Sequence, residues 1–93
     1  MKEEDVYDRA IRLWGKNPQL LQTIEEMSEL TKEILKHVNR EQNNISELVE
    51  EAADVEIMLS QLKRCLNIEK QVEEYKQGKI QKISKKLDEW ENK

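Results

Sequence analysis

Hydrophobic residues recur every three to four positions along most of the chain, which is the spacing of an amphipathic α-helix. The spacing predicts a short helix over about residues 3–14 and a second helix that ends near Val38. Between them, residues 15–18 interrupt the pattern with Gly, Asn and Pro. Asn17 is predicted to cap the second helix, with Pro18 at its first helical position, where no backbone N–H is needed.

The second half of the chain predicts two further helices. A polar connector over residues 40–44 precedes the third helix, and Asn44 and Glu47 have the spacing of a capping box at its start. The hydrophobic spacing is interrupted at Asn67, which separates the third helix from a fourth helical stretch. Gly78 weakens that last helix and is a candidate position for a bend.

Each long predicted helix carries a hydrophobic stripe on one side. The stripe of the second helix comprises Leu20, Ile24, Met27, Ile34, Leu35 and Val38. The stripe of the third helix comprises Leu48, Ala52, Val55, Leu59, Leu62 and Leu66. The short connector makes these helices antiparallel neighbours. The sequence therefore predicts a single all-α domain over residues 1–93, in which antiparallel helices form a four-helix-bundle-type core.

Composition adds an expectation about assembly. The chain has 93 residues, of which 37% are hydrophobic, and this is too little to bury several long amphipathic helices within one copy. We therefore expect a homo-oligomer, either a dimer or a tetramer, to complete the core. Two Gly and one Pro leave little room for strands and tight hairpins, which agrees with an all-α fold.

Charge is distributed unevenly along the chain. The net charge of −4 argues against binding to a nucleic-acid polymer. Ten acidic and three basic residues lie between positions 25 and 56, whereas eight basic and three acidic residues lie between positions 63 and 86. Either the acidic centre holds a metal and the basic tail holds the anion that accompanies it, or the two regions pack against each other.

The sequence also bears on where the protein resides. The single Cys65 fits a reducing compartment, and no hydrophobic run reaches the ~18–20 residues that span a bilayer. The acidic residues at positions 3–5 do not resemble the start of a secretory signal. We therefore expect a cytoplasmic protein that makes no contact with a membrane.

Two acidic couplets supply the candidate chemistry. Glu26 and Glu29 lie three residues apart in the second predicted helix, and Glu51 and Asp54 have the same spacing in the third. This spacing places both carboxylates of a couplet on one helix face, and an antiparallel pair of helices can bring the two faces together. Converging carboxylates need a counter-ion, and an all-oxygen site suits Mg²⁺, with Mn²⁺ as the other possibility. The alternative interpretation is a solvated face of an acid-rich chain.

The couplets and their flanks resemble the signature of MazG-like nucleotide pyrophosphohydrolases. Residues 24–30 (IEEMSEL) and 50–55 (EEAADV) are similar to the E-E-x-x-E and E-x-x-D motifs of that family. Residues 14–20 (WGKNPQL) are similar to its G-x-x-x-Q-L lead-in. Residues 74–82 (EYKQGKIQK) are similar to its basic K-I-x-R-L element, with Lys82 where arginine is more usual. The resemblance covers roughly residues 10–87.

The resemblance implies an all-α oligomer, built around four-helix bundles, that uses Mg²⁺ to hydrolyse a (d)NTP to the (d)NMP and pyrophosphate. Carried over position by position, it implies metal ligands at Glu26, Glu29, Glu51 and Asp54. It also implies that Lys79 and Lys82 face the phosphates. Lysine at position 82 supplies a point charge in place of a bidentate guanidinium, so its grip on phosphate differs from that of arginine.

Four further residues are candidates for roles in such a reaction. Hydrolysis of a phosphoanhydride needs a base that deprotonates the attacking water, and Glu25 and Glu50 are candidates because they adjoin the couplets. Trp14 is expected either to anchor the core or an interface, or to stack on the nucleobase. Gln19 is a candidate to read the nucleobase through its amide.

Three alternatives would use the same residues. A non-catalytic helical interaction module would employ the acids and lysines as salt bridges between helices. A phosphoribosyl-ATP pyrophosphohydrolase-type enzyme would keep the acidic site and differ in its pocket. A degenerate member of the family would bind a nucleotide without hydrolysing it.

Overall fold

The computed structural model describes residues 2–41 and 43–93, and its secondary structure is entirely helical. The four helices are α1 (Glu3–Trp14), α2 (Lys16–Asn39), α3 (Ile45–Leu66) and α4 (Glu69–Glu91). No strand occurs among the described residues. The prediction of an all-α chain with four helical segments is therefore confirmed, with each predicted boundary within a few residues of the observed one.

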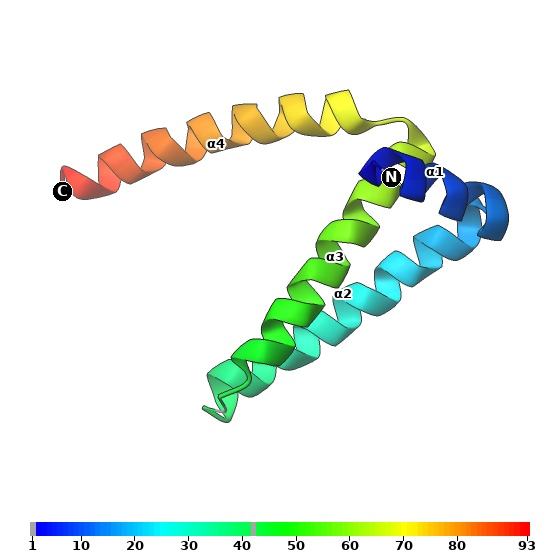
Figure 1. The fold of residues 1–93 in the computed structure, drawn as a ribbon. Helices are drawn as coiled ribbons and strands as arrows, with labels where there is room; N and C mark the ends of the chain where they lie inside the picture. Colours follow the sequence, from blue (N-terminus) through cyan, green and yellow to red (C-terminus); the bar gives the residue numbers. More distant parts are fainter. Residues whose placement is uncertain (1, 42) are drawn as a thin grey trace.

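The helices are arranged as an open V (Figure 1). α2 and α3 run antiparallel and form a pair that we call the central hairpin. α1 lies across the end of this hairpin opposite the α2–α3 connector, and it contacts both helices. α4 leaves the same end and projects away from the hairpin, in contact with α3 alone. One chain therefore consists of the central hairpin, the short α1 across its end, and the projecting α4, which we call the arm.

The core of a single chain is small and unusually polar. Its buried hydrophobic residues are Ala10, Val55 and Met58, and no residue of α4 is buried. Five polar or charged residues are also buried, namely Gln19, Thr23, Glu33, Asn44 and Gln61. The hydroxyl of Thr23 donates hydrogen bonds to the backbone carbonyls of Gln19 at 2.9 Å and of Met58 at 3.5 Å, so it links α2 to α3.

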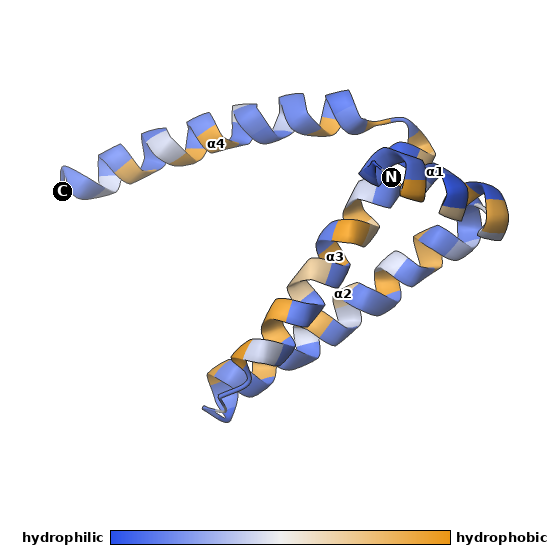
Figure 2. Cartoon of the chain, in the orientation of Figure 1, coloured by the Kyte–Doolittle hydropathy of each residue, from blue (hydrophilic) through white to orange (hydrophobic). Residues whose placement is uncertain are grey.

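The predicted stripe of α2 does not face α3. Ile24 is 62% exposed and Val38 is 65% exposed, because α2 turns the edge that bears Gln19, Thr23 and Glu33 toward its neighbour. Hydrophobic residues recur along α2, α3 and α4 (Figure 2), and many of them remain on the surface. A contiguous hydrophobic surface of this kind usually marks a site of association.

Two predicted helix caps differ from the structure in their local chemistry. α2 begins at Lys16, after Gly15 with φ of +94°, so the prediction that Asn17 caps this helix is wrong. Asn44 is the N-cap residue of α3, but its side chain makes no cap hydrogen bond, so the predicted capping box is also wrong. Gly78 lies inside α4, which is helical from Glu69 to Glu91.

Asn44 instead ties the two long helices together at the connector. Its amide nitrogen donates to the backbone carbonyl of Glu33 at 2.9 Å and to the Glu33 carboxylate at 3.1 Å. Its amide oxygen lies 3.2 Å from Nδ1 of His37. Lys36 forms an ion pair with Glu33 at 3.1 Å. Hydrogen bonds from Asn44, followed by that from Lys36, lower the pKa of Glu33.

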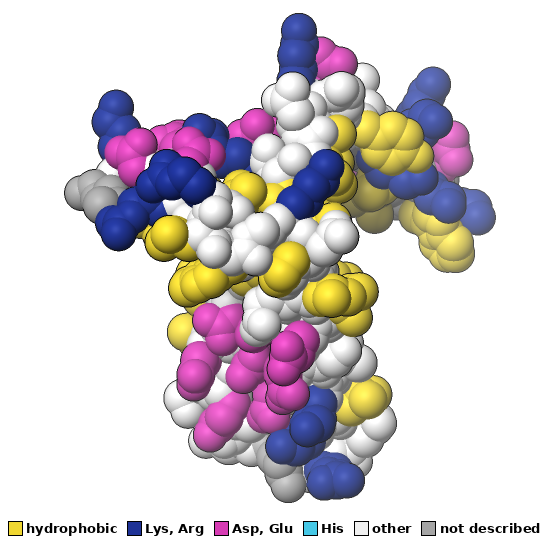
Figure 3. All heavy atoms as spheres, turned by 90° about the vertical axis from the view of Figure 1, so that its right-hand side faces the viewer, with side chains coloured by type: hydrophobic (Ala, Val, Ile, Leu, Met, Phe, Trp, Pro, Cys, Tyr) yellow, Lys and Arg dark blue, Asp and Glu magenta, His cyan; other side chains and the backbone are white. Residues whose placement is uncertain are grey.

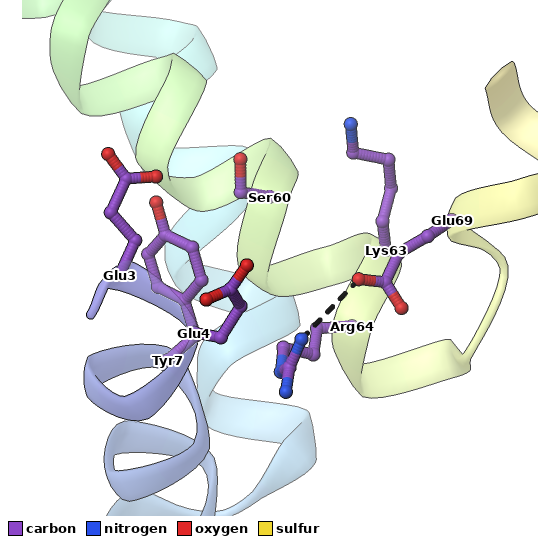
Figure 4. Close-up of a pocket in the computed structure, with 7 residues that line it drawn as sticks. All are labelled: Glu3, Glu4, Tyr7, Ser60, Lys63, Arg64 and Glu69. Atoms are coloured by element: carbon purple, nitrogen blue, oxygen red, sulfur yellow. Dashed lines mark ion pairs between the residues drawn. The ribbon is translucent and has the colours of Figure 1, made fainter.

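Arg64 joins three helices at the other end of the hairpin. Its Nε and Nη2 atoms donate to the two carboxylate oxygens of Asp8, at 2.6 and 2.9 Å, which links α3 to α1. Its Nη1 atom also pairs at 3.6 Å with Glu69, the first residue of α4. Figure 4 shows this corner, where Tyr7 from α1 and Ser60 from α3 line a hollow of about 240 Å³. The pairing orients the start of α4.

Asn67 lies between α3 and α4 and provides the turn after which α4 projects away from the hairpin. It ends α3 in the left-handed conformation, with φ of +56°, and its backbone N–H donates to the carbonyl of Arg64. Left-handed asparagine is a common helix terminator. None of the helices in the described part of the chain combines the length and hydrophobicity needed to cross a membrane.

Candidate metal centre

The two acidic couplets meet across the central hairpin. One carboxylate oxygen each from Glu26 on α2 and from Glu51 and Asp54 on α3 lie within 4.8 Å of one another. All three residues are half-buried. Figure 3 shows acidic side chains gathered on one face of the hairpin, which is the face turned away from the direction of α4. The antiparallel pairing of α2 and α3 thus produces a cluster of three carboxylates.

Glu51 is the least compensated member of the cluster. Its Oε2 atom is buried without a hydrogen-bond partner, the sole such side-chain atom among the described residues. Burial raises the pKa of Glu51, and the neighbouring charges of Asp54, Glu26, Glu29 and Glu50 raise it further. A buried carboxylate among like charges is costly unless a donor or a cation compensates it. Glu51 therefore has the electrostatic environment of a cation ligand.

The other two members border a small hollow. Glu26 and Asp54 line it together with Ile57 and Met58, and its volume is about 130 Å³. The amide nitrogen of Gln22 donates to the Glu26 carboxylate at 2.8 Å, one helical turn away. This hydrogen bond restricts the Glu26 side chain and leaves its second oxygen available to a ligand.

Glu29, the fourth predicted ligand, lies outside the cluster. Its side chain is half exposed and forms an ion pair at 3.9 Å with Lys32 on the same helix. It is close enough for its charge to contribute to the raised pKa of Glu51. The candidate bases Glu25 and Glu50 are both exposed. A role for these three residues stays a prediction.

The predicted phosphate-facing lysines are far from the cluster within one chain. Lys79 and Lys82 belong to α4, and α4 does not contact α2. Both lysines are exposed on the projecting arm. The structure therefore separates the basic element from the acidic cluster, and a single copy does not bring them together.

Trp14 and Gln19, in contrast, lie next to the acidic cluster. Both line a groove of about 480 Å³ between α2 and α3. Ile57 and Met58 line both this groove and the hollow beside Glu26 and Asp54, so the two are neighbours. The remaining residues that line the groove are Pro18, Gln22 and Gln61.

Sequence reasoning missed two polar residues of this region. Gln61 is buried, and Gln22 orients a member of the cluster. The position of Gln22 four residues before Glu26 was a usable signal, because that spacing places two side chains on neighbouring turns. Gln61 carried no such signal, since its burial depends on how α2 and α3 are rotated toward each other.

The cluster fits a hard divalent cation in its donor atoms and nearly in its dimensions. Mg²⁺ binds oxygens at about 2.0–2.1 Å in octahedral geometry, which sets adjacent ligands about 3 Å apart and opposite ligands about 4.2 Å apart. The three carboxylate oxygens lie within 4.8 Å of one another, which is close to the upper of these distances. Three carboxylates leave further coordination positions for water or phosphate oxygens.

Comparison with known proteins adds no relative to this geometry. No protein-family model, curated protein or solved structure matches the chain. The resemblance to MazG-like enzymes therefore stays a prediction that depends on the motifs of this sequence.

Proposed function

We propose that the protein is a MazG-like, Mg²⁺-dependent nucleoside triphosphate pyrophosphohydrolase, which converts a (d)NTP and water to the (d)NMP and pyrophosphate. The observation that carries the proposal is the buried, unpartnered Oε2 atom of Glu51 beside Glu26 and Asp54. A carboxylate in this position gains most from a cation, and the cations that suit oxygen ligands commonly arrive with phosphates.

In this proposal Glu26, Glu51 and Asp54 hold Mg²⁺, with Mn²⁺ as a substitute. Glu29 joins them after a side-chain rotation that gives up its exposed pairing with Lys32. When bound, the metal neutralises charge on the phosphate oxygens. The chain's own groups position the metal. Gln22 orients Glu26, and burial of Glu51 makes its carboxylate a strong ligand once deprotonated.

The remaining groups of the proposed reaction come from the surface of the hairpin. Glu50 is next to Glu51 in sequence and is exposed, which leaves it accessible to solvent as the base that takes a proton from the attacking water. Glu25 is the equivalent candidate on α2. The groove beside the cluster is the space for the nucleoside part of the substrate.

We further propose that a homo-oligomer, a dimer or a tetramer, completes a four-helix bundle and brings the lysines into the site. α4 buries none of its residues, whereas most of the stability of a helix in a protein comes from packing its hydrophobic face. Tyr75, Lys79 and Ile83 are spaced by four residues and share one face of α4. Association through this face would take Lys79 into the interface, where an acidic partner surface compensates its charge.

One observation favours a second candidate, a non-catalytic helical interaction module. The exposed stripes of α2 and α4 would serve any helical partner, with or without catalysis. The two candidates differ in their response to metal. An interaction module keeps its stability when Mg²⁺ is replaced by EDTA, whereas a protein with an uncompensated acidic cluster gains stability from the metal.

The proposal is tested by measuring release of pyrophosphate from a panel of dNTPs and NTPs with Mg²⁺. We expect pyrophosphate release from at least one nucleotide. In Glu51→Gln we expect the rate of release to fall at least about a hundredfold, because a ligand of the metal that neutralises the phosphate charge is removed. Glu47→Gln is the matched control, since Glu47 is an exposed acid one turn earlier on α3. Absence of pyrophosphate release from every nucleotide, or equal rates in wild type and Glu51→Gln, would contradict the proposal.

A further inference from the structure

Two glutamine side chains in the groove are buried but not paired. Gln19 on α2 is 6% exposed and Gln61 on α3 is 5% exposed, and both line the groove beside the acidic cluster. The hydrogen bonds among the described residues include none to either side-chain amide. Neither amide is sealed from solvent, because Glu51 Oε2 is the one fully buried side-chain atom without a partner in the described chain. Both residues line the groove, and Gln61 also borders a hollow of about 330 Å³ beside α1.

Buried amides in proteins are nearly always hydrogen-bonded, to protein or to ordered water. Each glutamine amide offers two N–H donors and a carbonyl acceptor, so this pair presents a concentrated set of free donors and acceptors. A ligand whose hydrogen-bond donors and acceptors match those of both amides would replace water at a site that is already formed. Gln22, the third amide of the groove, is only half-buried and uses one of its N–H donors on Glu26.

The rest of the groove suits a flat heterocycle. Trp14 forms one wall, and its indole is largely exposed and available for stacking. Pro18, Ile57 and Met58 supply hydrophobic contacts around the two amides. Because Ile57 and Met58 also border the acidic hollow, a molecule bound in the groove would lie beside the carboxylate cluster.

We propose that Gln19 and Gln61 together read the hydrogen-bonding edge of a nucleobase that stacks on Trp14, and that Gln61 is a specificity-determining residue. The proposal rests on the proposed function for the phosphate part of the substrate, which lies toward Glu26 and Asp54. Its substrate class is a nucleotide whose base presents adjacent donor and acceptor groups to two amides. A site built on paired amides rejects a base with the wrong pattern, because its buried polar groups are then left unpaired.

The test uses nucleosides first, because they carry the base without phosphate and need no metal. Binding is followed through the side-chain amide resonances of Gln19 and Gln61, and through Trp14 fluorescence in a Trp90→Phe background. We expect at least one nucleoside to shift both amide resonances and to perturb Trp14. Among the four dNTPs, we expect kcat/KM to differ by about tenfold or more between the best and the worst base.

Two variants isolate Gln61. Gln61→Met keeps the length of the side chain and removes its hydrogen bonds, and Gln61→Glu keeps an acceptor and removes the donors. We expect Gln61→Met to bring the dNTP preference within about threefold and Gln61→Glu to change the preferred base, with Mn²⁺ affinity unchanged in both. Gln77→Met on α4 is the control, because Gln77 is exposed. The dNTP preference is read from whichever Gln61 variant retains the helical circular dichroism of the wild type, because that variant is folded.

The outcomes separate this proposal from the proposed function. Pyrophosphate release with the same base preference in wild type and in the Gln61 variants would overturn the role of the amides and leave the enzymatic activity standing. Nucleoside binding that depends on Gln61, without any hydrolysis, would support the base site and overturn the activity. Nucleosides that shift neither amide nor Trp14 at millimolar concentration would overturn the base site.

Discussion

At the scale of single residues, the acidic site consists of three carboxylates that converge across the central hairpin. The spacing of the couplets predicted that Glu26, Glu51 and Asp54 converge, because i, i+3 pairs share a helix face whatever the details of packing. It did not predict that Glu29 lies outside the cluster, since a side-chain rotation decides this. It also gave no sign of Gln61, whose burial is a property of two helices together.

Glu51 is predicted to make the metal-free protein less stable as pH rises. A raised pKa means that the folded protein binds a proton more tightly than the unfolded chain does. The protonated carboxyl therefore favours folding, and this contribution is lost as pH increases from the ordinary glutamate pKa of about 4.3 through the raised value. Glu51→Gln removes this dependence, because its amide does not titrate.

Urea unfolding in EDTA at several pH values checks this prediction. The stability of Glu51→Gln relative to wild type is expected to increase between pH 4 and neutral pH, and added Mg²⁺ is expected to stabilise the wild type and Glu47→Gln more than Glu51→Gln. Glu47→Gln serves as the exposed control. A stability difference that stays constant over this range would show that the environment of Glu51 is not the one described.

Asn44 is predicted to be the most sensitive polar residue of the fold. Its amide is buried and donates to the backbone carbonyl of Glu33 at 2.9 Å and to the Glu33 carboxylate at 3.1 Å, so Asn44→Ala removes both hydrogen bonds from a buried site. We expect a loss of about 1–3 kcal/mol in the free energy of unfolding. Urea denaturation measures it, with Asn43→Ala at an exposed neighbour as control. Equal stability of the two variants would refute the structural role of Asn44.

At the scale of helices, the hydrophobic spacing predicted the limits of each helix well, but it did not predict which face of α2 packs against α3. α1, α3 and α4 begin and end close to their predicted limits. The stripe of α2 was expected to lie within a core, but in one chain it stays exposed, because α2 faces α3 through a more polar edge. Periodicity identifies which side of a helix is hydrophobic, whereas the rotation of two packed helices depends on contacts such as that of Thr23 with Met58.

The orientation of α4 is predicted to depend on Arg64. This guanidinium is the described group that pairs with both Asp8 on α1 and Glu69 on α4, and α4 has few other contacts with the hairpin. In Arg64→Gln we expect a broader range of angles between α4 and the hairpin. Spin labels at exposed positions of α2 and α4 would report this as a wider distance distribution, and Asp8→Asn should give a smaller change in the same direction.

Lys63→Gln is the control for this experiment, because Lys63 precedes Arg64 on α3 and pairs with none of the described residues. A distance distribution that is equally wide in wild type and in Arg64→Gln would show that the corner does not orient α4.

At the scale of the whole molecule, the open V explains why composition predicted assembly. A chain with a small polar core, an exposed α2 stripe and a projecting α4 leaves most of its hydrophobic surface unburied. The acidic face lies on the side away from α4, so the lysines of the arm do not meet the acidic cluster within one chain. The proposed function therefore depends on an oligomer for its basic element and on one chain for its metal ligands.

Binding of Mn²⁺ to the wild type and to Glu51→Gln tests the central claim most directly, because it requires neither a substrate nor the lysines of α4. Free Mn²⁺ is measured by electron paramagnetic resonance at neutral pH, with Glu47→Gln as control. We predict saturable binding to wild type and control, and an affinity at least about tenfold weaker in Glu51→Gln. Equal affinity in all three proteins, or no saturable binding to the wild type, would contradict the metal centre formed by Glu26, Glu51 and Asp54.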